Sequence, residues 1–269
     1  MLPERILALL TAAVVAICIG VGLLLMGPEP AKRDSGLVAL LGPRKIDKGV
    51  ARNEVETLIA ATPDYQQYFA RLRETFTADY EAAIEDFAAR RAETGDERSV
   101  DYYLSEAVRK LRQAHGALAA KAEPDAMAQV FTRQLEVLQA VAQSDKHLCV
   151  GFLYGATNID FQNFAATQRP LVATMALASL EAMVDGQAKQ IERERPTEAD
   201  LKILETALAD RGLGQVEIDA LLDGKMPDPP LEDAKMCAAG QSYFEVLRIL
   251  PEPARARVHA LALELMAKS

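Results

Sequence analysis

Two cysteines and one histidine are the residues of this sequence whose types and spacing could do chemistry. Cys149 lies in the segment HLCVGFLYG, two residues after His147, and Cys237 lies in the segment KMCAAG. A cysteine beside a histidine can act as a nucleophile when the imidazole takes the thiol proton. Two cysteines can instead form a disulfide when their Cα atoms lie within about 7 Å of each other. The sequence therefore offers a reactive thiol or a structural bond.

The sequence around the two cysteines favours the disulfide. Helical positions two apart point to different faces, so His147 is poorly placed to activate Cys149. Small neighbours would let two helices approach closely, and they flank both cysteines: Gly151, Ala238, Ala239 and Gly240. We therefore predict a Cys149–Cys237 disulfide that closes a loop of about 89 residues.

A buried carboxylate is the other candidate for chemistry. Glu181 interrupts the apolar stretch VATMALASLEAMV. Burial would raise its pKa toward the range of a general acid, as a glycan-cleaving enzyme requires. The alternative interpretation is a Glu at the exposed edge of an amphipathic helix, which we favour because a chain with 39 acidic residues offers many such positions by chance.

Other common reactive patterns are missing from the sequence. The three histidines, His115, His147 and His259, are not spaced as metal ligands, and there is no Cys-x-x-Cys or His-Glu-x-x-His motif. The phosphate-loop, dinucleotide-glycine and Gly-x-Ser-x-Gly patterns are also missing. The sequence thus assigns no catalytic residue, no metal ligand and no cofactor.

The elements that would position these residues begin with an apolar segment. Residues 6–27, ILALLTAAVVAICIGVGLLLMG, carry no charged side chain and would form a helix about 33 Å long, enough to cross a bilayer. A small-x-small cleavage site does not follow, and Ile17 precedes Cys18 where a lipoprotein has a small residue. We predict that residues 1–27 are a short tail and an uncleaved single-pass anchor in contact with membrane lipid.

A basic linker and a helical domain are expected after the anchor. Residues 28–50 contain three prolines and several glycines, typical of a linker, and an apolar patch at residues 37–41. From residue 51 to residue 269 the apolar spacing is helical, with no convincing strand. We predict an all-α fold of 51–269, with possible sub-bundles at 51–143 and 144–269.

The helices of this domain can be placed from apolar spacing and from capping residues. Aromatic and aliphatic residues follow one stripe over 63–93, which predicts one long helix beginning at Pro63. With helices from Ser99 and over 124–142, and short polar turns between them, residues 51–143 should form an up-and-down bundle of three long helices. Six further candidates are 148–153, 169–190, 198–210, 216–222, 231–250 and 253–267.

The side of the membrane that the domain faces depends on two opposing signals. Six bases follow the anchor and one precedes it, which the positive-inside rule interprets as a cytoplasmic domain. An even number of cysteines after the anchor suits an oxidising compartment instead. A short tail before a signal-anchor helix is also typical of bacterial proteins with a periplasmic domain. We expect a single-pass protein of the bacterial inner membrane whose C-terminal domain is periplasmic.

The charge of the domain excludes one class of partner. The whole chain carries −9, residues 28–52 carry +3, and Glu4 and Arg5 cancel, so residues 53–269 carry −12. Nucleic acid is therefore not an expected partner, because its phosphates require basic protein surfaces. The sequence favours a non-enzymatic envelope protein that binds another protein or itself. The alternative is an anchored helical hydrolase of cell-wall glycan.

Overall fold

The computed structural model describes residues 46–95, 97–155, 158–224 and 227–268. Within these ranges the fold is all-α, as the sequence predicts, with twelve α-helices, one 3₁₀ helix and no strand. No helix in these ranges has the length and apolar composition needed to cross a membrane. The predicted anchor at residues 6–27 and most of the linker lie outside the described residues, as does Cys18.

The first part of the described chain forms the helices α2 to α6. The linker ends earlier than predicted, because Asp47 caps α2 by accepting hydrogen bonds from the backbone N–H groups of Gly49 and Val50. Ser99 caps α5 in the same way through Tyr102 N–H. The elements are α2 (Lys48–Ala60), α3 (Pro63–Thr75), α4 (Thr77–Thr94), α5 (Val100–His115), the 3₁₀ helix η2 (Gly116–Lys121) and α6 (Pro124–Ser144).

Seven more helices complete the domain. All six candidates from the sequence are present within one or two residues, and one helix, α8, was not predicted. The elements are α7 (Lys146–Leu153), α8 (Ile159–Thr167), α9 (Arg169–Lys189), α10 (Glu198–Asp210), α11 (Gln215–Asp223), α12 (Asp233–Ile249) and α13 (Ala254–Lys268).

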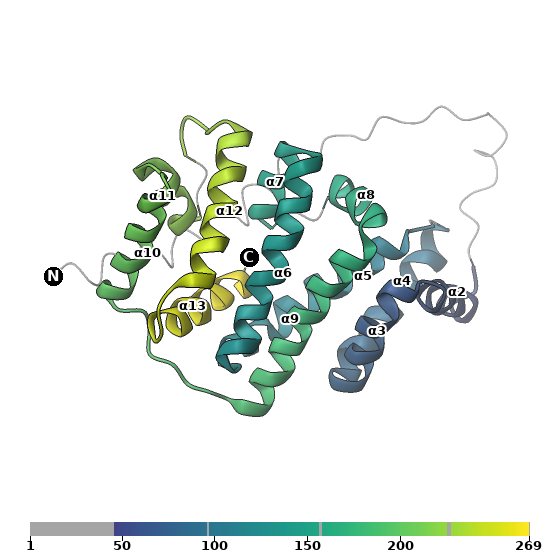
Figure 1. Cartoon of the computed structure of the whole chain (residues 1–269). Coiled ribbons are helices and arrows are strands. Elements are labelled where there is room, and N and C mark those ends of the chain that lie inside the picture. The colour runs from purple at the N-terminus through teal and green to yellow at the C-terminus, as the bar shows by residue number, and fades with distance from the viewer. Residues whose placement is uncertain (1–45, 96, 156–157, 225–226, 269) are drawn as a thin grey trace.

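Two long helices, α6 and α9, lie in the middle of the molecule. Helix α9 packs against α6, η2 and α3, while α6 also packs against α12 and α7. Figure 1 shows α2, α3 and α4 gathered at one end and α10 and α11 at the other. The buried apolar side chains form one connected cluster with members from every described helix. The predicted division into sub-bundles at residue 143 stays a prediction.

The single long helix expected over 63–93 is wrong, because the chain breaks it at Phe76. The backbone of Phe76 has φ −127° and ψ 61°, so it separates α3 from α4. The ring of Phe76 remains buried and packs on the imidazole of His115, with the two ring centroids 4.8 Å apart. The apolar positions on both sides of the break still face one core, because α3 and α4 both place aromatic residues in it.

The three-helix bundle expected over 51–143 also differs from the structure. Helix α6 lies chiefly against α9 and α12 and not against α4 or α5. The cause is η2, which follows α5 directly and packs between α9 and α13. This 3₁₀ segment redirects the chain, so α6 does not fold back along α5.

A glycine allows the closest approach between α9 and η2. A Cβ atom placed on Gly186 would lie 1.8 Å from the carbonyl oxygen of Leu118 and 2.7 Å from its carbonyl carbon. The segment after α9 then crosses the same 3₁₀ helix, where Arg193 donates hydrogen bonds to the carbonyl oxygens of Ala120 and Ala122. The backbone of η2 is thus held from two sides by residues far along the chain.

Candidate functional site

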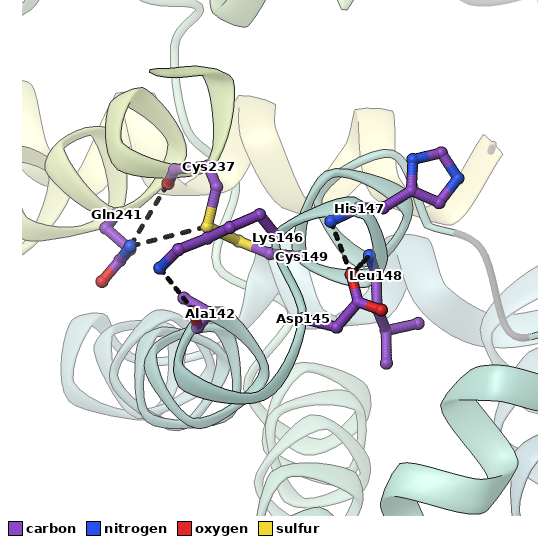
Figure 2. The surroundings of a disulfide bond; sticks show 8 residues. All are labelled: Ala142, Asp145, Lys146, His147, Leu148, Cys149, Cys237 and Gln241. Carbon is purple, nitrogen blue, oxygen red and sulfur yellow. Dashed lines mark hydrogen bonds between the residues drawn. A yellow bond between two sulfur atoms is a disulfide. The ribbon is translucent and has the colours of Figure 1, made fainter. Parts of the chain in front are cut away.

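The predicted disulfide joins α7 to α12. The Cα atoms of Cys149 and Cys237 are 5.7 Å apart and their sulfur atoms are bonded. Both residues are fully buried, and Figure 2 shows the bond between the two helices with Gln241 beside it. The Gln241 side chain donates a hydrogen bond to the carbonyl oxygen of Cys237 at 3.4 Å. As predicted, a small residue allows the close approach of the two helices, because a Cβ added at Gly240 would lie 2.8 Å from Leu153.

His147 does not take part in chemistry at Cys149. The side chain of His147 is 89% exposed, and its Nδ1 lies 2.9 Å from a carboxylate oxygen of Asp233. In Figure 2 the imidazole points away from both sulfur atoms. The local reason is the start of α7, where the Asp145 carboxylate accepts hydrogen bonds from the backbone N–H groups of His147 and Leu148. Because the Cys149 sulfur is bonded to Cys237, it has no thiol proton for an imidazole to remove.

Glu181 lacks the burial that a general acid would need. Its side chain on α9 is 46% exposed. Both of its carboxylate oxygens accept hydrogen bonds from Arg71 on α3, at 2.7 and 3.1 Å. This pairing raises the pKa of Arg71. The geometry fits a surface ion pair between two helices that are distant in sequence.

Three carboxylates are buried in the described residues, and each has a basic partner. They are Asp101, Asp200 and Glu217. Asp101 pairs with Arg169, Asp200 with Arg257, and Glu217 with Lys235. Each pair connects two different helices, as buried charges normally require. Sequence reasoning missed all three, because acidic residues are too frequent in this chain for any one to stand out.

The Asp101 pair ties three helices together. Asp101, in the first turn of α5, accepts two hydrogen bonds from the Arg169 guanidinium at 3.0 Å each and one from the Tyr65 hydroxyl at 2.7 Å. Burial and the hydrogen bond to Asp101 raise the pKa of the Tyr65 hydroxyl. Tyr65 therefore stays protonated and donates to the carboxylate across the neutral pH range.

Replacing Arg169 with Met is expected to lower the free energy of unfolding by about 2 kcal/mol. The change leaves the Asp101 carboxylate, which is 1% exposed, with only the Tyr65 hydroxyl as a partner. The loss is smaller than the 3–5 kcal/mol typical of a fully buried pair, because the Arg169 side chain is 36% exposed and water can replace part of it. Urea unfolding of the detergent-solubilised protein measures the loss. Arg133→Met, which removes a pair within one helix, should change stability by less than about 0.5 kcal/mol.

The Asp200 pair combines a helix cap with a contact between helices. The Asp200 carboxylate and the Thr197 hydroxyl form a capping box at the start of α10. The same carboxylate accepts two hydrogen bonds from Arg257 on α13, at 2.7 and 2.8 Å. Arg257, together with the Thr197 cap, holds the pKa of Asp200 well below its usual value. The carboxylate therefore stays ionised within these structural hydrogen bonds and has no proton to donate at neutral pH.

His259 is the buried histidine of the described residues. It is 1% exposed, its ring lies 4.4 Å from the ring of Phe131, and its Nε2–H donates to the carbonyl oxygen of Leu247 at 2.9 Å. Burial lowers the pKa of His259 to about 4. The imidazole is therefore neutral in the folded protein at pH values where the unfolded chain is already protonated.

Because of His259, we predict that the protein loses stability in mild acid. The folded pKa is about 4 and the unfolded value is 6.5, so the contribution is fully present above pH 6.5 and is lost as the pH falls toward 4. Between pH 7.5 and pH 5 the loss from His259 alone is about 2 kcal/mol. Urea unfolding across this range should show it, and His259→Gln should flatten the slope. Gln187→Ala, at an exposed site without a titratable group, should leave the slope unchanged.

Two small cavities lie between the helices of the described part of the chain. One of about 160 Å³ lies between α4 and α5 and is lined by arginines and aromatic residues. A second, of about 230 Å³, also lies between α4 and α5 and is lined mainly by alanines and leucines. Both are below the 300–1,000 Å³ of typical small-molecule sites.

In the described residues, side chains that lie together form structural ion pairs more clearly than they form reactive groups. Within the described ranges no three His, Cys, Asp or Glu side chains are grouped so that they could hold a metal ion. The main geometric features are therefore the disulfide, the buried ion pairs and the arginine-lined cavity. Searches of protein-family models, curated proteins and solved structures gave no match to this chain.

Proposed function

We propose that this protein is a single-pass protein of the bacterial inner membrane whose helical domain lies in the periplasm. The domain acts as a non-enzymatic interaction or structural module that binds another protein or a second copy of itself. Residues 6–27 hold it in the lipid. The observation that carries the proposal is the disulfide between two fully buried cysteines on α7 and α12. Such bonds are typical of oxidising compartments and rare in the cytoplasm.

The state of the buried acids supports a structural role for the domain. A general acid or base needs a pKa near the working pH and access to its substrate. Asp200 and Glu217 have lowered pKa values because each is bonded to a basic side chain. Asp101 is bonded to Arg169 and Tyr65. These carboxylates stabilise contacts between helices and are not poised to transfer protons.

Reporter fusions test the location. Alkaline phosphatase, which is active only where its own disulfides form, and a reporter that is active only in the cytoplasm are fused in turn after Ser269. We expect activity from the phosphatase fusion alone. Activity from the cytoplasmic reporter alone would overturn the periplasmic placement.

Affinity purification tests the interaction role. The full-length tagged protein is cross-linked in cells, solubilised in detergent and purified, beside a tagged fragment that contains only residues 1–50. We expect one reproducible partner, or a dimer of the chain, with the full-length protein and not with the fragment. A monomer without partners in both samples would contradict the proposal.

A further inference from the structure

Arg112, in the last turn of α5, is a half-buried base without an acidic partner in the described part of the chain. Its Nε is buried and donates to no described residue. Burial lowers the pKa of Arg112, the nearby positive charge of Arg109 lowers it further, and no described carboxylate raises it. Because an arginine stays protonated in proteins, this side chain carries its charge partly out of water without compensation.

Other buried charged groups among the described residues have partners. The three buried carboxylates each pair with a basic side chain. Burial also lowers the pKa of Arg193, but its guanidinium donates hydrogen bonds to the carbonyl oxygens of Ala120 and Ala122. Buried charges are normally paired or hydrogen-bonded, because an unpaired one costs free energy. Arg112 therefore departs from the pattern of the fold.

The stem of Arg112 is held at the junction of three elements. A Cβ atom placed on Gly116 would lie 3.2 Å from Cγ of Arg112 and 2.8 Å from Cβ of Ala267. Gly116 is the first residue of η2, and Ala267 lies in the last turn of α13, which packs against η2. The first carbons of the Arg112 side chain are thus packed beside neighbouring backbone, so the guanidinium loses little further freedom when it binds a ligand.

The acids bound at this end of α5 belong to other bases. Arg109, one turn before Arg112, donates to both carboxylate oxygens of Glu106, at 3.1 and 2.7 Å. His115, in the same turn as Arg112, has its Nε2 3.0 Å from a carboxylate oxygen of Asp79. These acids therefore pair with other groups and leave the charge of Arg112 uncompensated.

The burial of the guanidinium decides which ligand it can take. Its Nε edge is sealed, so the part of this half-buried side chain that meets solvent is the opposite edge, with the two Nη groups. Two Nη groups present parallel N–H donors, which match the two oxygens of a carboxylate or of a phosphate. The position therefore suits an oxyanion that approaches the guanidinium end-on from solvent.

We propose that Arg112 binds an oxyanion, a carboxylate or phosphate group of a ligand, through its two Nη groups where α5 meets η2 and the end of α13. The bound group supplies the counter-charge that the described fold does not provide. Neither the membrane anchor nor the interaction role is needed for this site, because the described helices alone form it. A carboxylate and a phosphate share this chemistry, so the test uses each as a separate probe.

Thermal melting of the full-length protein in a non-ionic detergent tests the site. Sodium phosphate or sodium glutarate replaces sodium chloride at constant ionic strength and pH, over a hundredfold range of concentration. A ligand that binds the folded state alone stabilises it in proportion to the logarithm of its concentration once the site is filled. Each further tenfold increase in a bound probe should then raise the melting temperature by about 3–5 °C. We expect this rise with at least one of the two probes.

Charge-matched variants show whether Arg112 itself is responsible. Arg112→Met keeps an unbranched side chain and should abolish the rise. In chloride it should melt about 2–4 °C above the native protein, because a partly desolvated charge without a partner has been removed. Arg133→Met, which removes the same charge from a pair within α6, should keep the rise. Arg112→Lys keeps the charge but lacks the paired donors, and it should bind the probe roughly tenfold more weakly.

The remaining outcomes overturn the proposal. An equal rise in the native protein and in Arg112→Met would be a general effect of the salt. No rise with either probe would exclude an oxyanion site at Arg112. A lower melting temperature of Arg112→Met in chloride would show that the guanidinium stabilises the fold through a partner of its own. If Arg112→Met does not fold, an Arg112→Lys protein that binds the probe as tightly as the native protein would overturn the proposal instead.

Discussion

Replacing Cys149 and Cys237 together with Ala is expected to lower the free energy of unfolding by about 4.6 kcal/mol. The bond links residues 88 positions apart, and closing a loop of that length removes about this much chain entropy from the unfolded state. A typical domain has only about 5–15 kcal/mol of stability. The variant should therefore keep its helices at low temperature and unfold far below the melting temperature of the native protein.

Thermal unfolding of the detergent-solubilised protein, followed by circular dichroism, measures this loss. For a domain of this size about 1 kcal/mol corresponds to about 2–4 °C, so the melting temperature should fall by about 9–18 °C. Cys18→Ala, which removes the cysteine of the predicted anchor, is the control and should leave the transition in place. A thiol titration of the denatured native protein should find Cys18 alone. A shift of less than about 2 °C in the double variant would contradict a stabilising bond.

Replacing Gly186 with Ala is expected to lower the free energy of unfolding by more than about 3 kcal/mol. An alanine normally stabilises a helix relative to glycine by about 1 kcal/mol. Here the added Cβ would lie 1.8 Å from the Leu118 carbonyl oxygen, which is backbone and cannot rotate away. Helix α9 must move away from η2, which opens the central packing, so the steric cost exceeds the gain in helix propensity.

The same melting experiment measures this effect, with Gln187→Ala as the control. Gln187 is the next residue of α9 and is exposed, so its replacement should change stability by less than about 0.5 kcal/mol. If Gly186→Ala melts within about 2 °C of the native protein, α9 and η2 do not approach as closely as described.

Local signals predicted the helices well where a capping residue marked the boundary. Thr197 and Asp200 form a capping pattern at the start of α10, and Gly224 follows Asp223 at the end of α11. The sequence could not show that Asp200 also accepts hydrogen bonds from Arg257, 57 positions away. One side chain serves both a local cap and a long-range contact, and only the local role leaves a sequence pattern.

Breaks in the chain were harder to predict than helices. The apolar stripe through Phe76 continues at helical spacing on both sides, so it contains no sign that the backbone bends there. Helix α8 was missed although Asn158 caps it and Phe161 and Phe164 pack inward. Only Phe161, Phe164 and Ala165 of its nine residues are buried, so the segment shows little apolar periodicity. Short segments depend on tertiary packing more than on their own pattern.

Among the candidate sites, too, some features could be predicted from the sequence and others could not. The disulfide was predictable, because cysteines are few and small residues surround them. The buried ion pairs were not, because partners such as Asp101 and Arg169 come from two helices whose rotation about each other decides which side chains meet. Spacing within one helix does not determine that rotation.

The pairing of α3 with α9 constrains the order in which the chain acquires structure during synthesis. Arg71 on α3 bonds to Glu181 on α9, 110 positions later. At about 5–20 residues per second, α3 is made roughly 5–20 s before its partner. During that interval the aromatic face of α3 has no α9 to cover it, so its apolar side chains wait uncovered on that side until α9 has been made.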